Sequence, residues 1–108
     1  MTATLLSDEP TLQRFRDLLG NAYGPRLERA VLYGSRARGE ARSDSDYDVA
    51  VFLRDMVDRA SEMNRLADLA TDVLYNVGGC IHALPYRAGA YDERTPLMRE
   101  IRDDGVDL

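Results

Sequence analysis

A glycine–serine pair and two aspartates, each beside an apolar run, constrain this chain more than any other feature. Gly34 and Ser35 follow the apolar run 30–33, and ten residues separate Ser35 from Asp46, with Asp48 two positions later. The first run predicts a short buried strand that stops at Gly34, where glycine allows a sharp turn. The second, from about Asp48 to Leu53, predicts a strand whose period of two places Asp46 and Asp48 on one face of a sheet.

This pattern indicates a phosphate cradle facing a metal site. Gly34 allows close backbone approach to a ligand, Ser35 adds a hydroxyl, and a helix starting near Ser35 would direct free N–H groups at an anion. Two carboxylates beside a triphosphate suit Mg²⁺, which is held by one or two carboxylates and substrate phosphates. The chemistry implied is metal-assisted phosphoryl or nucleotidyl transfer.

The spacing Gly34-Ser35-x10-Asp46-x-Asp48 resembles the signature of the minimal nucleotidyltransferase family of the polymerase-beta-like superfamily. The order of expected elements is also similar: helix, strand, Gly-Ser turn, Asp-x-Asp strand, long helix and a further strand. The resemblance implies an α/β (α+β) fold with a small mixed β-sheet packed against helices. It also implies transfer of a nucleotide from Mg²⁺-ATP, with Gly34 and Ser35 on the phosphates and Asp46 and Asp48 on the metal.

The chain departs from that family at the third carboxylate. Family members carry this acid on the strand after the long helix, but this sequence has no Asp or Glu between Asp72 and Asp92. His82 is expected at that position. It could serve as a base, the site could work with two carboxylates, or efficient transfer could have been lost.

Other polar residues near the motif have both a functional and a structural interpretation. Arg36, Arg38 and Arg42 flank the cradle, where guanidinium groups can bind phosphate oxygens or pair with local carboxylates such as Glu40. Of these, Arg36 and Arg38 are the predicted nucleotide-binding residues. Cys80, in the strand of His82, is expected to be an inert buried thiol.

The resemblance also implies a partner. Small proteins similar to this one are commonly the antitoxin of a HEPN-domain RNase toxin, and some transfer AMP from ATP to a toxin tyrosine. The leading hypothesis is therefore transfer to a protein hydroxyl. One alternative is a non-catalytic module that neutralises its partner by contact, and a second is transfer to a small molecule such as an aminoglycoside.

Composition limits which classes of protein this chain can belong to. The 108 residues, 44% of them apolar, predict a single domain spanning 1–108, and a homo-oligomer is left open. Arginine supplies all 14 basic residues against 19 acidic ones, and a net charge of −5 argues against strong nucleic-acid binding. No apolar run is long enough for a membrane span, and one cysteine without a signal peptide predicts a cytoplasmic protein.

Helical periodicity predicts three main helices. The first is capped by Ser7 or Asp8, contains Pro10 in its opening turn and breaks between 20 and 25. The third strand is expected over 80–84. A last helix opens at Thr95-Pro96 and ends at Gly105, with Leu97, Met98 and Ile101 facing inward. The long middle helix carries an apolar stripe that we interpret as core packing: Met63, Leu66, Ala67, Ala70, Val73, Leu74 and Val77.

Overall fold

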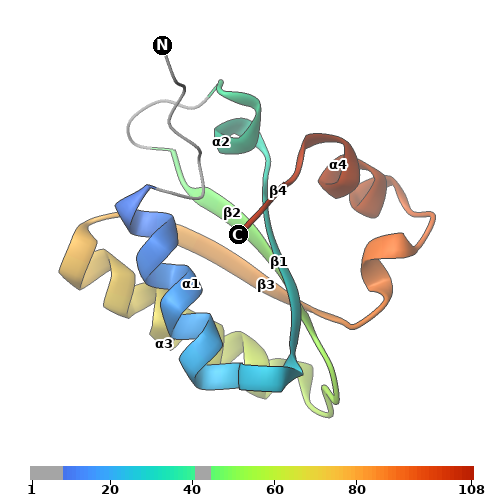
Figure 1. Cartoon of the computed structure of the whole chain (residues 1–108), viewed down its shortest axis with the longest axis horizontal. Helices are drawn as coiled ribbons and strands as arrows, with labels where there is room; N and C mark the ends of the chain where they lie inside the picture. The colour runs from blue at the N-terminus through green and yellow to red at the C-terminus, as the bar shows by residue number, and fades with distance from the viewer. Residues whose placement is uncertain (1–8, 41–44) are drawn as a thin grey trace.

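Helices alternate along the chain with the strands of one mixed sheet (Figure 1). The computed structural model describes residues 9–40 and 45–108. The expected cap residues Ser7 and Asp8 and the cradle residue Arg42 lie outside the described residues. In chain order the elements are α1 (Pro10–Tyr23), η2 (Gly24–Arg26), β1 (Leu27–Tyr33), α2 (Ser35–Arg38), β2 (Tyr47–Leu53), α3 (Arg59–Val77), β3 (Ile81–Arg87), η3 (Ala90–Asp92), α4 (Pro96–Asp104) and β4 (Val106–Asp107).

The sheet has the strand order β3-β2-β1-β4. β1 runs antiparallel to β2 and β4, whereas β2 and β3 are parallel and are joined through α3. Tyr33 lies opposite Asp48 at one end of the β1–β2 pair, and Asp48 lies opposite His82 in the β2–β3 pair. The expected small mixed sheet packed against helices is confirmed.

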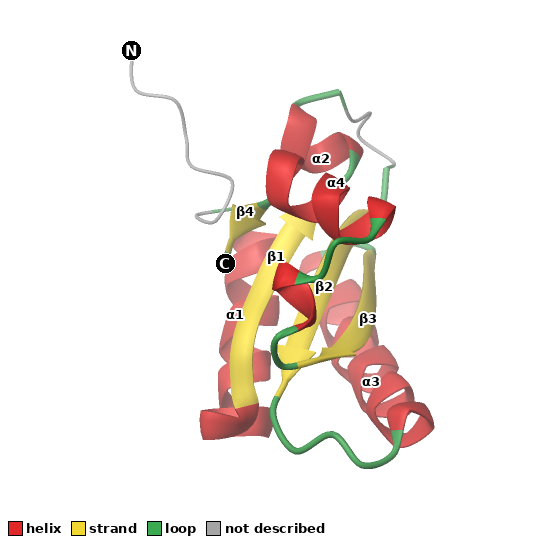
Figure 2. Ribbon diagram, turned by 90° about the vertical axis from the view of Figure 1, so that its right-hand side faces the viewer, coloured by secondary structure: helices red, strands yellow, loops and turns green. Residues whose placement is uncertain are grey.

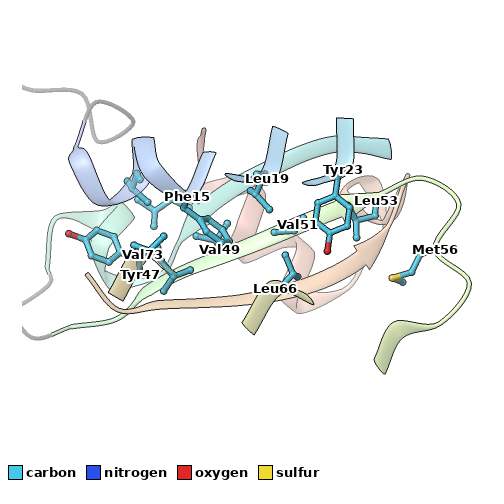
Figure 3. Close-up of a cluster of buried hydrophobic side chains, with 14 residues drawn as sticks. Phe15, Leu19, Tyr23, Tyr47, Val49, Val51, Leu53, Met56, Leu66 and Val73 are labelled. Carbon is cyan, nitrogen blue, oxygen red and sulfur yellow. The ribbon is translucent and has the colours of Figure 1, made fainter. Parts of the chain in front are cut away.

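The two faces of the sheet are covered by different helices. Figure 2 shows α1 and α3 behind the sheet and α4 in front of it. Tyr47, Val49 and Val51 of β2 point into the larger core with α1 and α3 (Figure 3). Ala50 and Phe52 point the other way, into a smaller cluster with Met98 and Ile101 of α4. By the same alternation, Asp48 belongs to the face that α4 covers.

Several element boundaries differ from the expectations. α1 does end within the expected interval 20–25, at Tyr23, where Gly24 adopts a φ of 53°. β3 does not stop before Pro85 but includes it, and β4, which is only two residues long, was not expected. A two-residue strand has too short a pattern to be recognised in a sequence.

The apolar stripe of α3 is only partly buried. Leu66 and Val73 are fully buried, but Met63, Leu74 and Val77 are 38%, 48% and 40% exposed, contrary to the prediction that the whole stripe packs in the core. α3 packs over β3, the last strand of the sheet, so the outer flank of the helix extends past the sheet margin. Leu97 of α4, predicted to face inward, is 40% exposed.

Candidate active site

The turn after β1 brings its backbone against a carboxylate. Gly34 has a φ of 77° and a ψ of −158°, a conformation that L side chains rarely adopt. A Cβ built on Gly34 would lie 2.8 Å from Oδ2 of Asp48. Glycine is therefore required here both by the backbone conformation and by the close approach of Asp48.

The helix that follows this turn is short. α2 begins at Ser35, as predicted, but contains only Ser35–Arg38 and closes with the Arg38 N–H donating to the Gly34 carbonyl at 3.1 Å. One turn has a small dipole, so the expected attraction of an anion by this helix is weaker than for a long helix.

The two aspartates lie at the start of β2. Asp48 is the second residue of the strand, and its side chain is 34% exposed. Asp46 precedes the strand and is exposed. It accepts a hydrogen bond from the Cys80 thiol, and this bond, followed by partial burial and the Asp46 charge, raises the pKa of Cys80. Asp46 therefore contacts Cys80, the residue just before β3, whereas Asp48 lies opposite His82 within β3.

His82 lies beside Asp48. Its Nδ1 atom is 3.4 Å from Oδ1 of Asp48, and its side chain is 60% exposed. This is the position at which the sequence predicted a substitute for a third acid. Among residues 9–40 and 45–108, no three His, Cys, Asp or Glu side chains are grouped so as to hold a metal ion. The donor set at this site consists of two carboxylates, which fits Mg²⁺ when substrate phosphates complete its coordination.

The predicted nucleotide-binding arginines have structural contacts. Arg36 donates from Nη2 to the Ser45 carbonyl at 2.7 Å, and its guanidinium stacks 4.0 Å from the centre of the Tyr47 ring. Arg38 donates to Glu40 at 2.8 Å and to Asp104 of α4 at 3.1 Å. Nucleotide binding by Arg36 and Arg38 stays a prediction, and these contacts hold α2 against β2 and α4.

Two neighbours of the site differ from the sequence-based interpretation. Cys80 is exposed and hydrogen-bonded to Asp46, so the prediction of a buried thiol is wrong. Tyr33 was not predicted as a site residue, yet it lies opposite Asp48 on β1. Burial, with smaller contributions from Tyr86 and Asp48, raises the pKa of Tyr33 to about 12, so its phenol stays protonated. The sequence signal that could have identified Tyr33 as a site residue is its position directly before Gly34.

The family model described as polymerase beta, nucleotidyltransferase, matches residues 20–79, more than half of the chain and all of the site from Gly34 to Asp48. The chain belongs to this family. It is therefore an enzyme of the nucleotidyltransferase type.

A curated relative has a related name. Over 79 residues the chain is 28% identical to the protein MJ0604 of Methanocaldococcus jannaschii, named as a candidate protein adenylyltransferase, and the match covers 73% of each chain.

Residues 9–40 and 45–108 contain no helix long and apolar enough to cross a membrane.

Two solved complexes contain chains of similar fold. A toxin–antitoxin crystal structure with AMP-PNP gives a TM-score of 0.61 at 20% identity, over 86% of this chain and 68% of that one. The complex of a tri-AMPylated Shewanella oneidensis HEPN toxin with an MNT antitoxin gives 0.53 at 16% identity, over 90% and 70% of the two chains. At these identities the likeness shows the fold.

Proposed function

We propose that this chain transfers AMP from Mg²⁺-ATP to a hydroxyl group of a protein, and that the acceptor is a HEPN-type toxin that the chain neutralises in the cytoplasm. The observation that carries this proposal is the contact between the Gly34 turn and the Asp48 carboxylate. A nucleotide phosphate bound along the turn would lie next to a carboxylate that can hold a metal.

Each residue of the motif then has a role. Gly34 and Ser35 bind the triphosphate through the backbone and a hydroxyl, with Arg36 and Arg38 as further candidate contacts. Asp46 and Asp48 hold Mg²⁺. Mg²⁺ supplies charge stabilisation for phosphates and for the leaving group when it is bound. The two aspartates lie at the end of β2 that is nearest to the turn, so they can serve one ligand together.

In the proposed reaction the acceptor oxygen forms a bond to the α phosphorus. The bond between the α phosphorus and the oxygen bridging to the β phosphorus breaks, and pyrophosphate leaves. The acceptor proton passes to a base, and His82, 3.4 Å from Asp48, is the candidate. The same histidine is alternatively a structural neighbour that orients the Asp48 carboxylate.

Named relatives support the choice of acceptor. MJ0604 is named for protein adenylylation, one similar fold was solved with AMP-PNP, and another was solved with a HEPN toxin carrying AMP groups. These statements describe those proteins, and their agreement on AMP and on a protein acceptor favours the same pair for this chain.

A second candidate function is neutralisation by contact without transfer. It is favoured by the histidine opposite Asp48 and by the absence, within the described residues, of a third acid grouped with Asp46 and Asp48. In that case the fold would serve as a protein-binding surface.

The test uses a HEPN-type toxin as acceptor, to be sought as a small helical protein encoded next to this chain's gene. ATP labelled at the α phosphorus should label this protein in a Mg²⁺-dependent manner, whereas ATP labelled at the γ phosphorus should not, because that phosphorus leaves in pyrophosphate. Asp48→Asn should stop the labelling. Asp68→Asn, which changes an exposed carboxylate on α3, is the matched control and should label normally.

Substitutions of His82 then separate its two roles. If His82 is a base, His82→Asn should lower the rate by about 10²-fold, and His82→Asp should preserve or raise it by restoring the acid usual in the family. Neutralisation of the toxin by both wild type and Asp48→Asn without any transferred label would establish the second candidate function instead.

A further inference from the structure

The outer edge of β3 is open over only half of its length. The Tyr47 N–H donates to the Cys80 carbonyl at 2.8 Å, and the Ala88 N–H donates to the Leu53 carbonyl at 2.9 Å. Because backbone groups alternate in direction along a strand, even-numbered residues of β3 bond to β2. The N–H and C=O groups of the odd-numbered residues therefore point away from the sheet, since β3 is its last strand (Figure 2).

The half of this edge that is far from the site is interrupted at Pro85. Pro85 has no N–H group to offer, and its carbonyl accepts a hydrogen bond from Nε of Arg59 at 3.3 Å. In the half near the site, the outward groups of Ile81 and Ala83 meet no hydrogen-bonding partner among the described residues. An open edge can pair with another strand, and Pro is a common device against such pairing. On the β3 edge, the described residues therefore leave room for pairing beside His82.

A groove runs along this open half. It has a volume of about 270 Å³ and is lined by α3 and by the start of β3: Leu66, Ala67, Ala70, Thr71, Leu74, Cys80, Ile81, His82 and Ala83. The lining includes residues from both faces of β3, so the groove lies along the strand's edge. It contains no Asp, Glu, Lys or Arg, which favours an uncharged apolar segment as occupant over a nucleic acid.

We propose that the acceptor protein docks here as an extended segment that pairs with Ile81 and Ala83, with its hydroxyl residue opposite His82. This inference rests on the proposed transfer to a protein hydroxyl. Side chains directly opposite one another in a sheet share a face, so the residue opposite His82 projects onto the Asp48 face. Its two neighbours project onto the α3 face, into the apolar groove beside Leu74.

The same geometry selects the length of the acceptor side chain. Asp48, His82 and the acceptor residue form one row across the sheet, with neighbouring strands about 4.8 Å apart. The acceptor backbone is thus two strand spacings from Asp48. A tyrosine carries its oxygen far enough from the backbone to extend over His82, whereas a serine oxygen remains close to its own strand. A tyrosine, the acceptor that the family resemblance already implies, therefore fits this docking mode, and the mode adds that apolar residues should flank it on both sides.

A pair of synthetic peptides tests the docking mode. The probe is acetyl-Arg-Thr-Val-Tyr-Val-Thr-Arg-amide, which places valine on the groove face. The control, acetyl-Arg-Val-Thr-Tyr-Thr-Val-Arg-amide, has the same composition with the alternation exchanged. In NMR titrations of the whole chain with Mg²⁺ and AMP-PNP, the probe should shift the amide signals of Ile81 and Ala83. It should bind at least about tenfold more tightly than the control, a difference of about 1.4 kcal/mol.

Two pairs of variants identify the edge and the groove. Ala83→Pro removes an outward N–H and should abolish probe binding, whereas Arg87→Pro removes one beyond Pro85 and should not. Leu74→Glu puts a charge in the groove and should weaken the probe at least about tenfold. Tyr75→Glu changes the next residue, which is 84% exposed and outside the groove, and should have no effect. If Ala83→Pro fails to fold, the second pair still decides.

The outcomes separate docking from catalysis. Binding of the probe with these preferences, but without transfer of AMP, would support the docking surface and count against the proposed function alone. Equal binding of both peptides, or probe binding unaffected by Leu74→Glu, would overturn the docking surface even if AMP reaches a protein acceptor. Shifts of Ile81 and Ala83 that follow protein concentration instead of peptide would also overturn it, because a second copy would then occupy the edge.

Discussion

At Gly34 the backbone and a carboxylate occupy adjoining space. Any side chain there would have to displace Oδ2 of Asp48, which is 2.8 Å from the position of a Cβ. Displacing that oxygen moves a proposed metal ligand. A substitution at Gly34 should therefore affect nucleotide binding more than it affects folding stability. A second glycine in the chain allows the two effects to be compared.

Gly24 supplies that comparison. It also has a positive φ with a negative ψ (53°, −128°), but a Cβ there would meet nothing within 4 Å. Gly34→Ala and Gly24→Ala should each lower the free energy of unfolding by about 1–3 kcal/mol through backbone strain. Only Gly34→Ala should also weaken Mg²⁺-ATP binding, by at least about tenfold. Urea unfolding and calorimetry measure the two effects, and equal ATP affinity in both variants would contradict the role assigned to Gly34.

Individual residues differ in how far the sequence predicts them. The position of His82 beside Asp48 follows from the pattern of strands, because parallel neighbours in register put both side chains in one row. The exposure of Cys80 does not follow, since apolar neighbours suggested burial while the residue lies just before β3 and bonds to Asp46. The contacts of Arg36 with Ser45 and Tyr47 depend on the course of the loop, which no local pattern specifies.

At the scale of elements, α3 is joined to the rest of the chain by two ion pairs of different burial. Nη2 of Arg26 lies 2.6 Å from Oε2 of Glu62, a carboxylate whose side chain is 10% exposed. Nη2 of Arg14 lies 2.8 Å from Oδ1 of Asp72, where the two side chains are 43% and 35% exposed. Loss of a partner costs most where the remaining charge is buried.

Matched arginine substitutions test this difference. Arg26→Met should lower the free energy of unfolding by about 2–3 kcal/mol because Glu62 stays buried without its partner. Arg14→Met should lower it by no more than about 1 kcal/mol, since water solvates Asp72. Both variants should keep the ATP affinity of the wild type, as neither residue contacts the Gly34 turn. Equal losses in urea unfolding would show that burial of Glu62 does not determine the anchoring of α3.

The sequence predicted the elements that have a long periodic pattern. It did not predict features that depend on a strand's place in the sheet. The stripe on α3 and the runs before Gly34 and after Asp48 gave the helix and strands that carry the site. Pro85 was expected to end β3, but an edge strand tolerates a missing N–H on its outer side. Which strand lies at an edge is a property of the whole sheet, and so the length of β3 could not be derived locally.

At the scale of the molecule, one face of the sheet packs in the larger core and the other face carries proposed site residues. α1 and α3 cover one face with the larger core, and α4 covers the other face (Figure 2). Asp48 and His82, which lie side by side in the sheet, belong to the face that α4 covers. The proposed nucleotide site and the open edge of β3 meet at His82. Under the proposed function, this arrangement would let the enzyme hold a nucleotide on its own surface and receive its second substrate from a partner protein.

Calorimetry of Mg²⁺-ATP binding tests the central claim most directly, which is that Asp46 and Asp48 together hold a metal against a nucleotide at the Gly34 turn. The wild type should bind ATP at least about tenfold more tightly with Mg²⁺ than with EDTA. Asp46→Asn and Asp48→Asn should each remove most of that difference, while Asp68→Asn should retain it. Equal affinity for ATP in Mg²⁺ among the wild type and both site variants would contradict the claim.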